Sequence, residues 1–219
     1  MAKLSVNVAL AELKGPDFKS SMKTLNAWEL VRFDVGLGGT PVTLTVSQVA
    51  KCNSVDECTI DVPIGVSYSI ASELKDNITN AQTTAERNDH RQLLMRIETH
   101  ARAHYSRVAK PLIPDWEADI RKDLDKTLPT RKTPTSEDEG QIQARLAPLV
   151  AYWVEELGYR IKKDVNGWEK TDYPQLVKFM QNFRSLSVFL PDGLPIPKFA
   201  SKPPKRPAIT FPACQARKS

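Results

Sequence analysis

The sequence predicts an α+β fold: an N-terminal antiparallel β-meander, then a helical region, then an extended basic Pro-rich C-terminal arm. Three observations predict it. Residues 1–80 alternate between apolar and polar side chains, residues 81–190 contain long segments of helical periodicity, and residues 191–219 combine prolines with basic residues. A chain of 219 residues is long enough to bury a core in one large domain or two small ones.

The predicted strands all lie in the first 70 residues. Apolar side chains alternate with others from Leu4 to Leu10, which is the period of a half-buried strand. Pro63 separates the last two candidates and predicts an edge position or a kink there. The other predicted strands cover 28–35, 41–47, 59–62 and 64–70, and their order along the chain predicts an antiparallel meander.

Four helices are predicted after the strands. The longest covers 82–109 and is expected to stop at Pro111, because proline cannot donate a helical hydrogen bond. The run Thr135–Glu139 is an N-cap followed by acidic residues, which is typical of a helix start. The remaining predicted ranges are 114–128, 135–163 and 173–189.

The net charge of +5 resides in the C-terminal end of the chain. Lys198–Ser219 contains six basic residues and no acidic one, so the remainder of the chain has a net charge of −1. Its prolines exclude a helix and favour extended, polyproline-like backbone. We interpret Lys202, Lys205 and Arg206 as contacts to nucleic acid; the alternative is a disordered, solubilising terminus. Phe199, Ile209 and Phe211 interrupt the basic run and are predicted to contact a neighbouring subunit.

All three histidines lie in the helix predicted over 82–109. His100 and His104 are four residues apart, so both could reach one metal ion, but zinc needs at least one further ligand and Ala101 replaces the glutamate of the HExxH pattern. His90 and His104 also project onto the apolar arc of this helix. We therefore interpret the histidines as structural and predict no metal site.

The same helix carries five arginines beside its apolar arc. Arginine binds phosphate through two parallel hydrogen bonds and is typical of proteins that follow a nucleic-acid backbone. The alternative interpretation is an ordinary solvated helix face. Tyr105 projects among these arginines and is a candidate for stacking on a base. Arg87, Arg91 and Arg102 lie on one flank, and Arg96 and Arg107 lie on the other.

Three cysteines do not form a recognisable metal or disulfide framework. Cys52 and Cys58 flank a segment rich in turn-forming residues, without the CxxC spacing of a zinc site. They are expected to be hairpin cysteines that form a disulfide only if oxidised. An odd number of cysteines fits a reducing compartment, so the chain is predicted to be intracellular (cytoplasmic) or part of a virion.

Motifs of the common enzyme classes are absent from the sequence. There is no G-x-S-x-G elbow and no P-loop, and Gly36–Gly39 lacks the third glycine of a dinucleotide site. No run approaches the roughly eighteen apolar residues of a membrane span, and the N-terminus lacks a signal-peptide core. The sequence therefore predicts no catalytic residues, no cofactor and no membrane partner.

The opening MAKL and the strand Val42–Gln48, followed by a hairpin with two cysteines, resemble small RNA-phage coat proteins over about a third of the chain. The long helical region departs from that pattern. Our hypothesis is a non-enzymatic coat or nucleocapsid-like subunit that self-associates into a homo-oligomer through its arm and binds nucleic acid, RNA in preference to DNA. The alternatives are an adaptor subunit whose basic arm binds an acidic protein, or a small enzyme with an unrecognised site.

Overall fold

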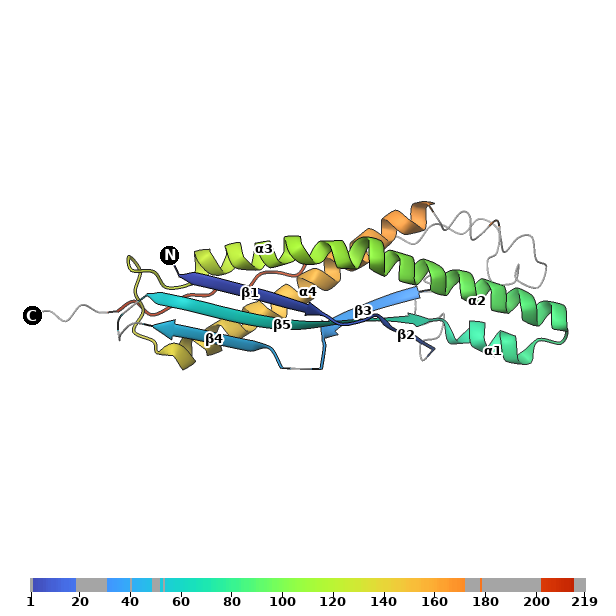
Figure 1. Cartoon of the computed structure of the whole chain (residues 1–219), viewed down its shortest axis with the longest axis horizontal. Helices are drawn as coiled ribbons and strands as arrows, with labels where there is room; N and C mark the ends of the chain where they lie inside the picture. The colour runs from blue at the N-terminus through green and yellow to red at the C-terminus, as the bar shows by residue number, and fades with distance from the viewer. Residues whose placement is uncertain are drawn as a thin grey trace, which may run out of the picture.

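The computed structural model describes residues 2–18, 31–39, 41–48, 52, 54–171, 178 and 202–214 (Figure 1). It is a mixed α and β chain in which helices cover one face of an open sheet. The long strand β5 (Val55–Ile70) alternates strictly from Cys58 onward, with every second side chain buried. Such a long half-buried strand gives the other strands a template on both of its edges.

The sheet is built around β5, which pairs with all four other strands. On one side β1 (Lys3–Leu10) and β2 (Lys14–Asp17) run parallel to it. On the other side β3 (Val31–Leu37) and β4 (Thr43–Gln48) run antiparallel to it. The register of the two edges meets at Ile64: Leu10 of β1 lies opposite it on one edge, and Leu37 of β3 lies opposite it on the other.

The predicted antiparallel meander is therefore wrong, although the predicted strands at 4–10, 28–35 and 41–47 overlap β1, β3 and β4. In a meander each strand pairs with its neighbour along the chain, whereas here the last strand pairs with all the others. Residues 59–62 and 64–70 are one strand that passes through Pro63. The carbonyl oxygen of Pro63 accepts a hydrogen bond from the Gly38 N–H at 2.9 Å, so the missing N–H faces the gap between β3 and β4, where no ladder bond is lost.

The helices follow β5 in the order α1 (Ser72–Asn80), α2 (Thr84–His104), α3 (Lys110–Thr127) and α4 (Glu139–Thr171). No helix was predicted over α1. The predicted helices over 82–109, 114–128 and 135–163 correspond to α2, α3 and α4. The predicted helix over 173–189 lies outside the described residues, apart from Lys178.

The predicted stop at Pro111 is wrong. A π-helical segment, η1 (Tyr105–Ala109), joins α2 to α3, and the Lys110 N–H bonds to the Tyr105 carbonyl. Pro111 then falls at the start of α3, where a missing N–H is tolerated. The result is one continuous rod along the long axis of the molecule (Figure 1).

Helix α4 starts at a capping box formed by Asp138 and Gln141. The Gln141 N–H donates to the Asp138 carboxylate at 2.9 Å, and the Gln141 amide oxygen accepts from the Asp138 N–H at 3.0 Å. Helix α4 then passes beneath β3, where a Cβ added at Gly158 would lie 3.5 Å from the Val35 Cβ.

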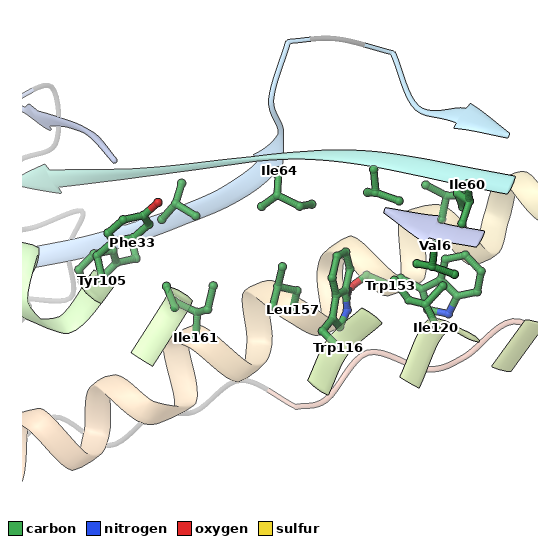
Figure 2. Packing of buried hydrophobic residues seen from close by; sticks show 14 of the residues in the cluster. Val6, Phe33, Ile60, Ile64, Tyr105, Trp116, Ile120, Trp153, Leu157 and Ile161 are labelled. Atoms are coloured by element: carbon green, nitrogen blue, oxygen red, sulfur yellow. Dashed lines mark hydrogen bonds between the residues drawn. The ribbon is translucent and has the colours of Figure 1, made fainter. Parts of the chain in front are cut away.

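The core lies between the sheet and the pair α3 and α4 (Figure 2). Trp116, Ile120 and Leu124 of α3 recur every fourth residue and are buried. Buried residues of α4 recur at three or four residues, as expected for the inward stripe of an amphipathic helix. They are Ile142, Leu146, Leu149, Trp153, Leu157 and Ile161.

Of the predicted arm over 191–219, the structure describes residues 202–214. This segment is extended and lies on the side of the helices away from the sheet (Figure 2). It ends at a disulfide between Cys214 and Cys52, whose Cα atoms are 5.4 Å apart. The predicted pairing of Cys52 with Cys58 is therefore wrong, because Cys58 points into the core and is fully buried.

Candidate nucleic-acid interface

The orientation of α2 follows from its cap and its buried stripe. The Thr83 hydroxyl accepts a hydrogen bond from the Glu86 N–H at 3.1 Å, and the Glu86 carboxylate accepts from the Thr83 N–H at 3.2 Å. This capping box fixes the first turn. The buried side is formed by His90, Leu93, Ile97, Ala101 and His104. All other long side chains of α2 therefore lie at its flanks or on its outer side.

The exposed charged residues along both flanks of α2 and η1 are basic. All five predicted arginines, Arg87, Arg91, Arg96, Arg102 and Arg107, are exposed, and so is Lys110. The three acidic residues between positions 82 and 110, which are Glu86, Asp89 and Glu98, are only partly exposed. We call the six exposed cations the cationic face. Its arginines extend over about 30 Å, at a rise of about 1.5 Å per residue.

Two aromatic residues lie beside the cationic face without being available to a base. The predicted stacking role of Tyr105 is wrong, because its ring is buried and its hydroxyl donates a 2.7 Å hydrogen bond to the Ala11 carbonyl. That bond ties η1 to the end of β1. The pKa of the Tyr68 hydroxyl is raised by burial, while the nearby Arg102 guanidinium opposes this shift. Arg102 is therefore partly engaged with the core, unlike Arg87 and Arg91.

The histidines are part of the packing. His104 lies against the ring of Phe33, with centroids 4.9 Å apart, and is buried. Burial lowers the pKa of His90, which keeps that imidazole neutral near pH 7. Within the described residues, no group of three or more His, Cys, Asp or Glu side chains could hold a metal ion.

The cations of the arm do not join the cationic face. Lys202 and Lys205 are exposed, and the segment 202–214 to which they belong runs beside α3 and not α2 (Figure 1). Arg206 is engaged within the chain, since its Nε donates to the Asp123 carboxylate at 2.8 Å and its Nη2 to the Thr127 hydroxyl at 2.7 Å. The structure thus divides the predicted nucleic-acid-binding residues between two separate surfaces and gives Arg206 a partner of its own.

The residues predicted to contact a neighbouring subunit contact their own chain instead, where the structure describes them. Ile209 and Phe211 are half-buried and pack against the core of their own chain. Phe199 lies outside the described residues. No local sequence signal identifies Asp123 and Thr127 as the residues that receive the arm, because they are 83 and 79 positions away from Arg206.

A pocket of about 530 Å³ lies at the end of the sheet, next to the loop that follows α3. Its charged lining residues are Asp56, Asp125, Arg131 and Lys132, so both signs are present. Neither histidine nor cysteine lines it. The pocket therefore brings carboxylates and cations together without a histidine or a thiol beside them.

No protein-family model, no curated protein and no solved structure matches this chain. Among the described helices, none is both long enough and apolar enough to cross a membrane. Any assignment of function therefore depends on the surface chemistry of the chain itself.

Proposed function

We propose that this chain is a non-enzymatic assembly subunit that binds the phosphate backbone of nucleic acid, RNA in preference to DNA. The observation that supports the proposal is the composition of the cationic face, in which every fully exposed charged residue between positions 82 and 110 is basic. An ordinary solvated helix mixes both signs. Here the acidic side chains are only partly exposed, so the exposed guanidinium groups dominate the potential along both flanks of the helix.

The geometry suits a polyanion better than a single phosphate. Exposed arginines spread over about 30 Å cannot converge on one phosphate group, but they match a backbone that carries one charge every few ångströms. Binding of this kind is independent of base sequence and releases counterions. If about five cations contact phosphates, log affinity falls with log salt at a slope of about −4.5 for duplex DNA or about −3.5 for a single strand.

The test replaces Arg87, Arg91 and Arg107 with alanine. These three are exposed and make no contact with the Tyr68 hydroxyl, so their loss is not expected to disturb the core. Removing three phosphate contacts should flatten the salt slope by about two to three units and weaken binding to all sequences alike. Fluorescence anisotropy with labelled single-stranded RNA and duplex DNA, each at four salt concentrations, measures both effects.

Two matched variants distinguish the effect of where the cations lie from the effect of the total charge of the chain. Replacing Lys14, Lys122 and Lys126 with alanine removes the same total charge from exposed positions outside the cationic face and should change the slope little. Replacing the three arginines with lysine keeps the charge and should preserve the slope while lowering affinity modestly. Equal losses in the two alanine variants would mean that only net charge matters, and the cationic face would no longer be a candidate interface.

If the chain is instead an adaptor subunit, the cationic face binds an acidic protein, and a different result is expected from the same variants. An acidic protein partner would also be attracted to exposed arginines, but purified nucleic acid would then bind weakly and without a difference between the variants. The enzyme alternative requires a catalytic group, and the pocket that Asp56 and Asp125 line is where a mutational search for one would begin.

A further inference from the structure

Half-buried side chains recur along the described part of the arm, first at a spacing of three residues and then at a spacing of two. Pro204 and Pro207 are half-buried and three residues apart, which is one turn of polyproline II helix. Pro207, Ile209 and Phe211 are half-buried and two residues apart, which is the period of an extended strand. The intervening side chains are exposed. The arm therefore presents one continuous face to the surface beneath it, as a docked peptide ligand does.

That surface has a side chain aimed at the one arginine of the described arm. The Asp123 carboxylate accepts the Arg206 Nε–H on Oδ1 at 2.8 Å and the Trp153 indole N–H on Oδ2 at 2.9 Å. The indole bond from α4 orients a carboxylate of α3 towards the arm. Charge-assisted hydrogen bonds between arginine and a carboxylate are shorter and stronger than neutral ones, so this pair holds the arm at a defined position.

The end of the arm is fixed by backbone pairing. The Pro212 carbonyl accepts hydrogen bonds from the Thr135 hydroxyl at 2.9 Å and from the Ser136 N–H at 3.2 Å. The Cys214 N–H donates to the Pro134 carbonyl at 3.2 Å, immediately before the disulfide to Cys52. We call the surface formed by Asp123, Thr127, Pro134–Ser136 and Cys52 the arm seat.

The arm and the arm seat belong to different parts of the chain. The arm seat is contained in residues 52–171, and the thirty residues 172–201 connect it to the arm. Thirty residues reach at most about 100 Å when extended. A neighbouring copy can therefore place its arm on this arm seat with every contact unchanged, since the same residues meet in the same geometry.

We propose that the arm exchanges between copies of this chain, and that the disulfide between Cys52 and Cys214 then locks one copy to the next. The proposal rests on the self-association included in the proposed function and gives it a molecular basis. The occupant of the arm seat is the arm of a second copy, in place of the copy's own.

The concentration of the protein decides whether the arm seat binds the arm of its own copy or that of a neighbouring copy. An arm tethered to its own chain through a connection of thirty residues competes with an effective concentration of about a millimolar. In dilute solution the copy's own arm wins. In an assembly the local concentration of neighbouring arms is comparable, so exchange becomes competitive without any new contact.

The locking step is a two-electron oxidation. The thiols of Cys52 and Cys214 form one S–S bond as a disulfide oxidant such as oxidised glutathione is reduced to two thiols, which take up the two protons. Cys58 does not compete, because it is fully buried and its pKa is raised to about 11, which suppresses the reactive thiolate.

The experiment mixes two full-length variants, Cys52→Ser and Cys214→Ser, that differ in mass through a tag. Neither can form the disulfide within one chain. The two variants are mixed at about millimolar concentration in glutathione redox buffer. An excess of the covalent heterodimer joined through Cys52 and Cys214 over its statistical share indicates that the arm of one copy occupies the arm seat of the other. Non-reducing electrophoresis and peptide mass mapping identify it.

We expect the heterodimer to exceed the homodimers of either variant several-fold, and to decrease several-fold when Arg206→Ala is added to the Cys52→Ser chain. Monomers only, or homodimers and heterodimers in statistical proportion, would overturn the exchange. Salt-dependent nucleic-acid binding is measured on the same two variants. Intact binding without the heterodimer refutes the exchange alone, whereas a heterodimer formed by protein that does not bind nucleic acid refutes the proposed function and supports the exchange.

Discussion

Replacing Asp123 tests the link between α3, α4 and the arm. The Trp153 side chain is 4% exposed, so the Asp123→Ala variant leaves its indole N–H buried without its acceptor. A buried hydrogen bond to a charged acceptor contributes about 1.5–3 kcal/mol. The ion pair with Arg206 joins side chains that are 37% and 20% exposed, so it adds about 0–1 kcal/mol. The expected loss in free energy of unfolding is therefore about 1.5–4 kcal/mol.

Asp123→Asn is the matched variant. Its amide oxygen still accepts the indole N–H, while the charge that attracts Arg206 is gone. This variant should lose about 1 kcal/mol or less, and Arg206→Ala should lose a similar amount. Urea denaturation followed by tryptophan fluorescence and by circular dichroism measures all three. If the asparagine variant is as unstable as the alanine variant, the indole bond is not the main term and the reasoning about Trp153 is wrong.

Three other perturbations have a clear expected sign. Because burial raises the folded-state pKa of the Cys58 thiol to about 11, its contribution to stability is complete below the unfolded pKa of about 8.5 and is lost as the pH rises towards 11. Wild-type stability should accordingly fall more steeply than that of Cys58→Ala over this range in denaturant titrations, and parallel curves would contradict the burial of the thiol. Gly15→Ala should destabilise the chain by more than 1 kcal/mol, because φ is +129° and the added Cβ would lie 2.5 Å from the Tyr68 carbonyl oxygen. Gly140→Ala in α4 meets only the Asp138 carboxylate at 3.5 Å and should stabilise the chain by about 0.5–1 kcal/mol, and a loss of thermal stability there would contradict the helical assignment of its first turn.

The local sequence pattern was sufficient to predict those strands and helices whose conformation depends on residues close to one another in the sequence. The alternation from Leu4 to Leu10 predicted β1, and the acidic N-cap region before Glu139 predicted the start of α4 within a few residues. It failed at proline. Pro63 lies within β5, because its missing N–H faces the gap between β3 and β4, where no partner strand needs it. Pro111 lies within a continuous rod, because the π-helical segment before it ends at Ala109 and places Pro111 in the first turn of α3.

The candidate interface was partly predictable for the same reason. Helical periodicity placed Arg87, Arg91 and Arg107 outside the apolar arc, and the structure leaves them exposed. The burial of Tyr105 was not predictable from that projection, since its hydroxyl bonds to the Ala11 carbonyl, which is 94 positions away in the sequence. Arg206 was interpreted as a phosphate contact because its partner, Asp123, is remote in sequence.

The sequence by itself determined the alternating strands, the capped amphipathic helices and the charge of each segment, because these depend on residues within a few positions of one another. Only the tertiary structure decided that β1 is parallel to β5, that Cys52 pairs with Cys214 across 162 positions, and that Arg206 lies on Asp123. The physical reason is that strand direction, disulfide partner and ion pair are set by the joint packing of the sheet, the helices and the arm. Such packing depends on contacts between distant residues, and no local period records them.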